Sequence, residues 1–192
     1  SSPYSFLGIG TKAFRGTVEN RSMGGLGMLG DSIHLNLKNP AAYSDLKLTT
    51  FTAGATTNSV ELESASGSDN LDYLTLDYIA IGLPFNNLGV GFGVKPRSAV
   101  GYELEESTTT TASRLNGRGG LNTVHFSVGF EPFKNFRLGG TINYNFGDIE
   151  NKSLIFRDQI QFASRELNFV DINGLSYNVG ALYKFNLNEK LT

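Results

Sequence analysis

The chain has 192 residues and a formal net charge of −2, so its charge gives no reason to expect nucleic acid as a partner. It contains no cysteine, which excludes disulfides, zinc–thiolate sites and thiol catalysis. Glycine is abundant at 23 residues, above the typical share of about 7%, and no run of about 18 apolar residues exists that could form a membrane helix. No export signal is visible and residue 1 is serine, so we expect a mature form from which the signal has been removed; a chain trimmed at its start would look the same.

Residues 1–45 show no regular alternation and contain seven glycines. The run Met23-Gly24-Gly25-Leu26-Gly27-Met28 suits a tightly packed backbone. Its spacing differs from that of a dinucleotide-binding loop, and no βαβ pattern surrounds it. Asn39-Pro40, followed by small residues, indicates a turn into the first strand. We predict that residues 1–45 form a hatch or plug segment and that residues 46–192 form the strands.

From residue 46 onward the dominant pattern is an alternation of apolar and polar residues with period two. In 136–146 the even positions are almost all apolar or aromatic, whereas the odd positions are polar or small. Similar runs predict strands at 46–56, 71–83, 88–104, 121–130, 136–150 and 169–185, with the start of another at Lys190.

The connections between these strands are alternately short and long. Short connections are predicted at 84–87, 131–135 and 186–189, and longer polar ones at about 57–70, 105–120 and 151–168. This order is typical of outer-membrane barrels, and the 136–146 core would span roughly 25 Å at a tilt near 45°. A soluble β-sandwich is the alternative, but it rarely sorts its connections so strictly. We predict an all-β transmembrane barrel with its apolar side chains toward lipid.

The opposite strand faces would then look into the lumen. Gly89, Gly91 and Gly93 leave one wall without side chains, which weakens a strand unless something packs closely there. The N-terminal segment is the natural candidate; an apolar ligand or a partner segment is the alternative. His125 and Asn143 are further lumenal candidates.

Catalytic chemistry has little support. A hydrolase would need a serine beside His125, but Ser127 lies ~7 Å along the strand, and we expect His34 to be a hydrogen-bonded packing residue. The carboxylates fit solvated loops better than acid–base or calcium sites, and four basic residues could meet lipopolysaccharide phosphates. We expect no enzyme, no metal and no cofactor. The carboxylates are Glu61, Glu63, Glu103, Glu105, Glu106, Asp148 and Glu150, and the basic residues are Lys95, Arg97, Arg114 and Arg118.

The N-terminal motifs resemble a known family. Met23-Gly24-Gly25, followed after a spacer containing Asp31 by Asn39-Pro40-Ala41, resembles the signature of FadL-type outer-membrane proteins. That family includes channels for fatty acids and aromatic hydrocarbons and a related barrel of type IX secretion. The stretches at 3–10 and 19–25 resemble its Bacteroidota branch in particular.

The resemblance implies a 14-stranded barrel with an N-terminal hatch in its lumen. Because only six full strands and the start of a seventh are predicted, we expect these residues to be the N-terminal half of a longer chain; a barrel closed by several copies is the alternative. The first functional hypothesis is uptake of hydrophobic small molecules across the bacterial outer membrane. The second is a non-transporting barrel subunit of a secretion or outer-membrane protein assembly complex, with other outer-membrane proteins as partners.

Overall fold

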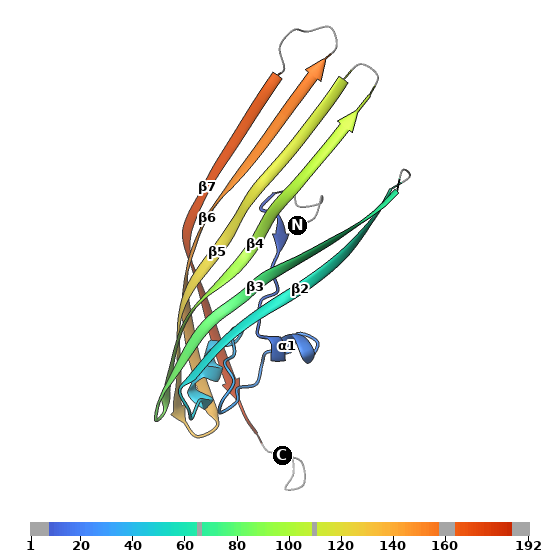
Figure 1. Cartoon of the computed structure of the whole chain (residues 1–192). Coiled ribbons are helices and arrows are strands. Elements are labelled where there is room, and N and C mark those ends of the chain that lie inside the picture. Colours follow the sequence, from blue (N-terminus) through green and yellow to red (C-terminus); the bar gives the residue numbers. More distant parts are fainter. Residues whose placement is uncertain (1–7, 65–66, 109–110, 158–163, 186–192) are drawn as a thin grey trace. The chain divides into compact units, whose positions relative to one another are not determined.

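The computed structural model describes residues 8–64, 67–108, 111–157 and 164–185. Six consecutive strands form an antiparallel sheet in the order β2-β3-β4-β5-β6-β7, and β1 pairs with β4 off this path (Figure 1). The prediction of an all-β fold with six full strands is confirmed. The additional strand is β1, whereas the strand start predicted at Lys190 and the connection at 186–189 lie outside the described residues. The bounds are β1 Thr11–Lys12, β2 Thr50–Ser64, β3 Gly67–Phe85, β4 Leu88–Ser107, β5 Thr111–Phe133, β6 Phe136–Arg157 and β7 Ser164–Tyr183.

Two short helices precede β2, and the sequence patterns predicted neither. Helix α1 (Val18–Ser22) begins at Thr17, which shares a capping box with Asn20. The 3-10 helix η2 (Pro40–Asp45) replaces the simple turn predicted at Asn39-Pro40; Asn39 caps it and Pro40 opens it. In the part of the chain that the structure describes, no helix is long and apolar enough to cross a membrane.

The short connections are confirmed as two-residue turns at Asn86-Asn87 and Lys134-Asn135. Asn86 and Asn135 adopt φ angles of 52° and 71°, the left-handed region that tight hairpins require and asparagine tolerates. The predicted long polar connections are largely wrong, because most of their described residues belong to strands. Ladder hydrogen bonds need no apolar face, so a paired hairpin can continue where the alternation fades.

A bulge keeps the apolar side chains of β3 on one face. The register between β2 and β3 shifts at Gly54/Ala55, which leaves Asp77 as the extra residue opposite β2. Leu74 and Leu76 before the bulge and Ile79 and Ile81 after it are therefore all exposed on the same side, although their sequence parity differs.

The contacts divide the chain into two compact units. The first, which we call the plug unit, contains the described residues of 15–95, 124–144 and 175–192, and the second, the β1 unit, contains those of 1–14, 96–123 and 145–174. The plug unit has a small apolar core around Leu35, Tyr43 and Leu46. The β1 unit has its own core, formed by Val100, Tyr102, Leu121 and Ile149.

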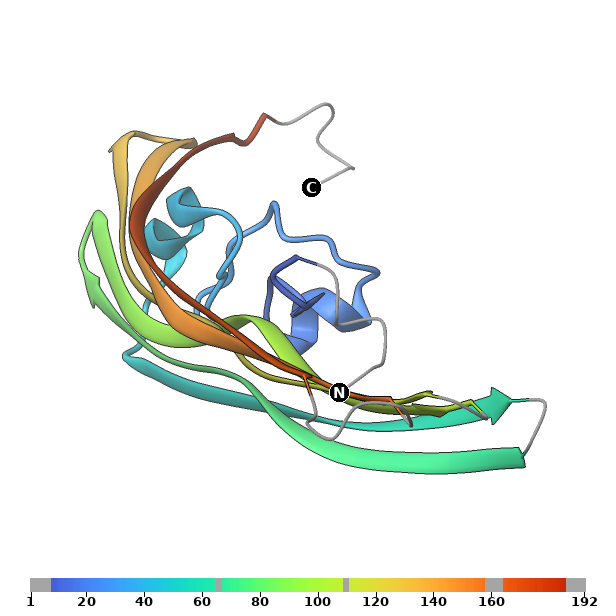
Figure 2. The same ribbon diagram turned by 90° about the horizontal axis from the view of Figure 1, so that it is seen from above.

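In the plug unit, the usual placement of polar and apolar side chains is reversed. Arg137, Thr141 and Asn143 of β6 are 8%, 8% and 4% exposed, whereas the alternating Leu138 and Ile142 are 44% and 50% exposed. We call the first side the buried face and the second the outer face. Helices α1 and η2 both lie on the buried face (Figure 2). The predicted separation into an apolar and a polar strand face is confirmed here.

Candidate functional site: a glycine cradle for the N-terminal segment

The buried face of the plug unit holds residues 15–46, which we call the docked segment. Helix η2 and its cap Asn39 lie against five glycines from four strands: Gly89, Gly91, Gly129, Gly139 and Gly180. A sixth glycine, Gly82 of β3, faces Leu35 and Leu46 on either side of the helix. A Cβ atom on Gly129 or Gly139 would come within 2.6 Å of the Pro40 carbonyl oxygen. Real Cβ atoms essentially never approach so closely, so the η2 backbone can reach the sheet only because side chains are missing there.

All three predicted glycines are closely packed, but the N-terminal segment covers only Gly89 and Gly91. The backbone of Tyr43 and Ser44 faces Gly89, and the Tyr43 ring covers Gly91. Gly93 instead faces Ala80, the Ile79 carbonyl and the His125 ring. The segment that packs on the cradle is the Asn39-Pro40-Ala41 motif with its following turn, and not the glycine run at 24–30.

A partly buried cluster of charges lies at the end of η2. The Asp45 Oδ1 atom lies 2.7 Å from Arg137 Nη2 at the start of β6, and both side chains are nearly buried. Lys184 Nζ lies 3.8 Å from the other Asp45 oxygen, and Glu131 lies 3.8 Å from Arg137. The Nε and Nη1 atoms of Arg137 have no hydrogen-bond partner among the described residues. We call the Asp45–Arg137–Lys184 cluster the latch.

Helix α1 provides a second anchor, on β2 and β3. The backbone N–H of Val18 donates to the Tyr78 hydroxyl at 3.1 Å. Arg21 donates to Thr56 Oγ1 at 2.7 Å and lies 3.8 Å from Asp77. Because Asp77 is the bulge residue of β3, the bulge also places a carboxylate near the positive charge of Arg21 on α1.

Side-chain donors join the two halves of the N-terminal motif. Five consecutive carbonyls, those of residues 25–29, each accept a hydrogen bond from the side chain of Asn20, Asn36, Lys38 or Asn39. Asn36 serves Gly27 and Leu29, and its own oxygen accepts from the Lys38 and Asn39 amides. Gly24 and Gly25 have φ angles of 67° and 85°, which only glycine adopts readily. Met23 is exposed, whereas Pro40 and Ala41 are buried.

His125 and Asn143 lie on the buried face, as predicted. Asn143 donates to the Ser176 carbonyl at 3.4 Å. His125 is 2% exposed, and neither ring nitrogen has a hydrogen-bond partner among the described residues. Ser127 instead bonds to Thr141 at 2.8 Å. The lumenal roles of these residues stay predictions.

His34 differs from its predicted role as a packing residue. Its ring nitrogen lies 2.6 Å from Asp31, and both side chains are about half exposed. The hydrogen bond from His34 is the main reason why the pKa of Asp31 lies below its usual value. The pair is hydrogen-bonded as expected, but it is not packed.

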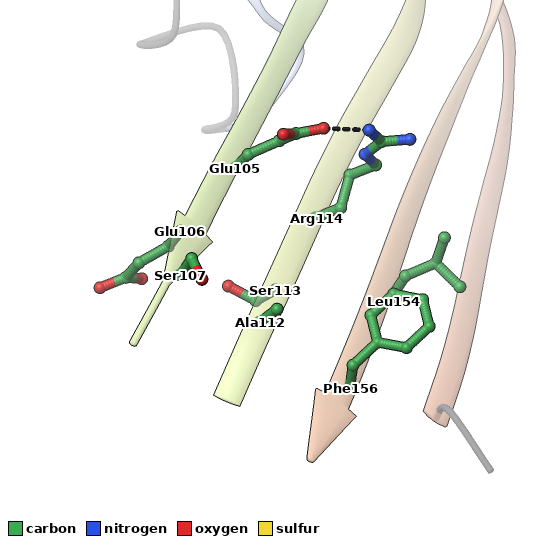
Figure 3. Close-up of a pocket in the computed structure, with 8 residues that line it drawn as sticks. All are labelled: Glu105, Glu106, Ser107, Ala112, Ser113, Arg114, Leu154 and Phe156. Atoms are coloured by element: carbon green, nitrogen blue, oxygen red, sulfur yellow. Dashed lines mark ion pairs between the residues drawn. The ribbon is translucent and has the colours of Figure 1, made fainter. Parts of the chain in front are cut away.

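The β1 unit contains a hollow of about 470 Å³ at the ends of β4, β5 and β6 (Figure 3). Leu154 and Phe156 line one side, and Arg114 forms an ion pair with Glu105 on the other. Arg118 pairs with Glu150 at 2.6 Å. Because carboxylates neutralise both arginines here, their contact with lipopolysaccharide stays a prediction.

The site is built for packing and charge pairing. Among the described residues, no three His, Asp or Glu side chains gather as metal ligands. The sequence analysis did not identify Tyr43, Asp45 and Arg137 as site residues. The one signal that could have pointed to them was the position of Arg137 on the polar side of its strand.

Comparison with known proteins gives one family. A family model described as BamG matches residues 1–192. No curated protein matches the chain, and no solved structure does.

Proposed function

The chain belongs to the BamG family, which is related to β-barrel assembly, and we propose that it is a membrane-inserted, non-transporting subunit of the complex that assembles outer-membrane barrels. Family membership places the protein in association with the outer membrane. Insertion into the bilayer, the place in a complex and the absence of transport are the proposal.

The exposed apolar face is the observation that carries the proposal of insertion. Ile142 and Tyr144 on the outer face are 50% and 48% exposed, while Asn143 between them is 4% exposed. At about 25 cal/mol per Å² of apolar surface, such a face would be costly in water. In hydrocarbon the same face is favourable, because the strands keep their backbone groups paired.

The covered buried face supports a scaffold rather than a channel. Uptake of hydrophobic molecules, as in the FadL-type channels that the sequence resembles, would need a passage lined by apolar side chains. The described buried face is instead polar at Thr141 and Asn143, and η2 packs against it without space for a Cβ. A subunit of type IX secretion is the other non-transporting reading, and the family match favours barrel assembly over it.

The unpaired edges of the sheet require further strands if the sheet lies in a membrane. In the described sheet, β2 and β7 each pair on one side only. Unpaired strand edges are not tolerated in lipid. We therefore include in the proposal that further strands, from this chain or another, close the sheet into a barrel.

The proposal is tested by depletion of the protein in its native cells. We expect lower amounts of folded outer-membrane barrels, co-purification of the protein with other assembly subunits in mild detergent, and unchanged uptake of a fatty-acid tracer. A lone monomer whose depletion slows uptake, but leaves barrel levels unchanged, would contradict it.

A further inference from the structure

We propose that the latch keeps the docked segment on the sheet in the working state of the protein, so that this segment is a fixed closure and not a gate. The inference deepens the proposed non-transporting role and rests on it for its meaning. Its test measures docking of the segment, and the depletion experiment measures barrel assembly, so the inference and the proposed function can fail separately.

The latch joins elements that are far apart in sequence. Asp45 ends η2, Arg137 begins β6 and Lys184 follows β7. The 2.7 Å contact between Asp45 and Arg137 is shielded from water, because their side chains are only 11% and 10% exposed. Screening by salt is weak at such depth. Undocking would separate this pair and leave Arg137 on the sheet with only the more distant Glu131 as a counter-charge, which is unfavourable.

The cradle makes partial movements unfavourable as well. The η2 backbone faces glycines from β4, β5 and β6 at distances that leave no room for a Cβ. A sideways shift would bring η2 against neighbouring residues that do carry side chains. The segment must therefore leave the sheet as a whole or stay in place.

The remainder of the docked segment is also fixed. Its loop carbonyls at 25–29 are bound by its own side chains, and α1 is held by Tyr78 and Thr56. A gate would need one weakly held end. Here α1, the loop and η2 are each anchored to the sheet or to one another.

Cysteine labelling tests the proposal, since these 192 residues contain no cysteine. Ser44 is 2% exposed in the docked state, and Ser44→Cys changes a single atom. Ser22→Cys, on the exposed side of α1, is the matched control. We expect a maleimide reagent to label Ser22→Cys at once in intact outer membranes, and Ser44→Cys at least a hundredfold more slowly.

Breaking the latch should release the segment. In the Ser44→Cys background, Asp45→Asn should raise the labelling rate at least tenfold, whereas Asp31→Asn, which removes an exposed charge from the same segment, should leave it unchanged. Heat-modifiable migration in gels would confirm that both variants are folded. Labelling of Ser44→Cys at the rate of Ser22→Cys, or no effect of Asp45→Asn in a folded protein, would overturn the proposal.

Discussion

The glycine cradle yields a prediction that two adjacent residues can decide. Gly139 and Gly140 are neighbours in β6, but they point to opposite faces. A Cβ on Gly139 would lie within 2.6 Å of the Pro40 carbonyl oxygen, while the nearest atom to a Cβ on Gly140 is 4.0 Å away. Gly139→Ala should therefore disturb docking of η2, and Gly140→Ala should not.

The magnitude follows from two opposing effects. Replacing a strand glycine by alanine favours the extended chain by about 0.5–1 kcal/mol. Overpacking against a backbone that cannot rotate away costs about 1–3 kcal/mol. We expect Gly140→Ala to be neutral or slightly stabilising and Gly139→Ala to weaken docking, with a difference of about 2 kcal/mol, or roughly thirtyfold in the undocked population.

Hydrogen exchange read by mass spectrometry measures this population directly. The amides of Ala42 and Leu46 are bonded within η2, and they should exchange about thirtyfold faster in Gly139→Ala than in Gly140→Ala. Equal exchange in the two variants would refute the cradle as the reason for the glycines.

Two further predictions concern the docked segment. Burial raises the pKa of Tyr43 to about 12, and the hydrogen bond with Ser127 opposes this with a smaller effect. The undocked tyrosine ionises near pH 10. The stability of docking should therefore be constant below pH 10 and fall between pH 10 and 12. Tyr43→Phe should remove this dependence in hydrogen exchange of η2, and an unchanged profile would show that another group is responsible. Asn36→Ala removes four hydrogen bonds of a buried side chain, so it should lower the stability of the docked segment by about 2–4 kcal/mol. The loop at 23–30 should then become sensitive to protease. Resistance equal to that of the parent protein would show that the hydrogen bonds from Asn36 to the loop carbonyls do not hold the loop.

The sequence predicted the strands better than their ends. Alternation in 136–146 located β6 and assigned its faces correctly, because burial acts separately on each side of a strand. It failed from 151 onward, because three polar residues are followed there by the consecutive apolar residues Leu154, Ile155 and Phe156, and such a run shows no alternation although β6 continues to Arg157. The β3 bulge at Asp77 was also hidden, since it reverses the parity of the pattern within one strand.

The sequence predicted one hatch over residues 1–45, whereas residues 15–46 lie on the sheet and Thr11–Lys12 form a strand paired with β4. Glycines at 89 and 91 indicated a close contact, and the contact exists. Helix α1 was missed because five residues are too few for a helical period, although Thr17 and Asn20 have the spacing of a capping box. The latch could not be predicted, because Asp45 and Arg137 come together only when η2 lies on the sheet.

The proposed insertion depends on contact between the outer face of the sheet and hydrocarbon. It is tested most directly by attaching a fluorophore to single cysteines in β6 and measuring quenching by lipids brominated on their acyl chains. We expect strong quenching at Leu138, Ile142 and Tyr144 and weak quenching at Thr141 and Asn143, with a period of two residues. Equal quenching at all five positions, or quenching of the whole series by a water-soluble reagent instead, would contradict it.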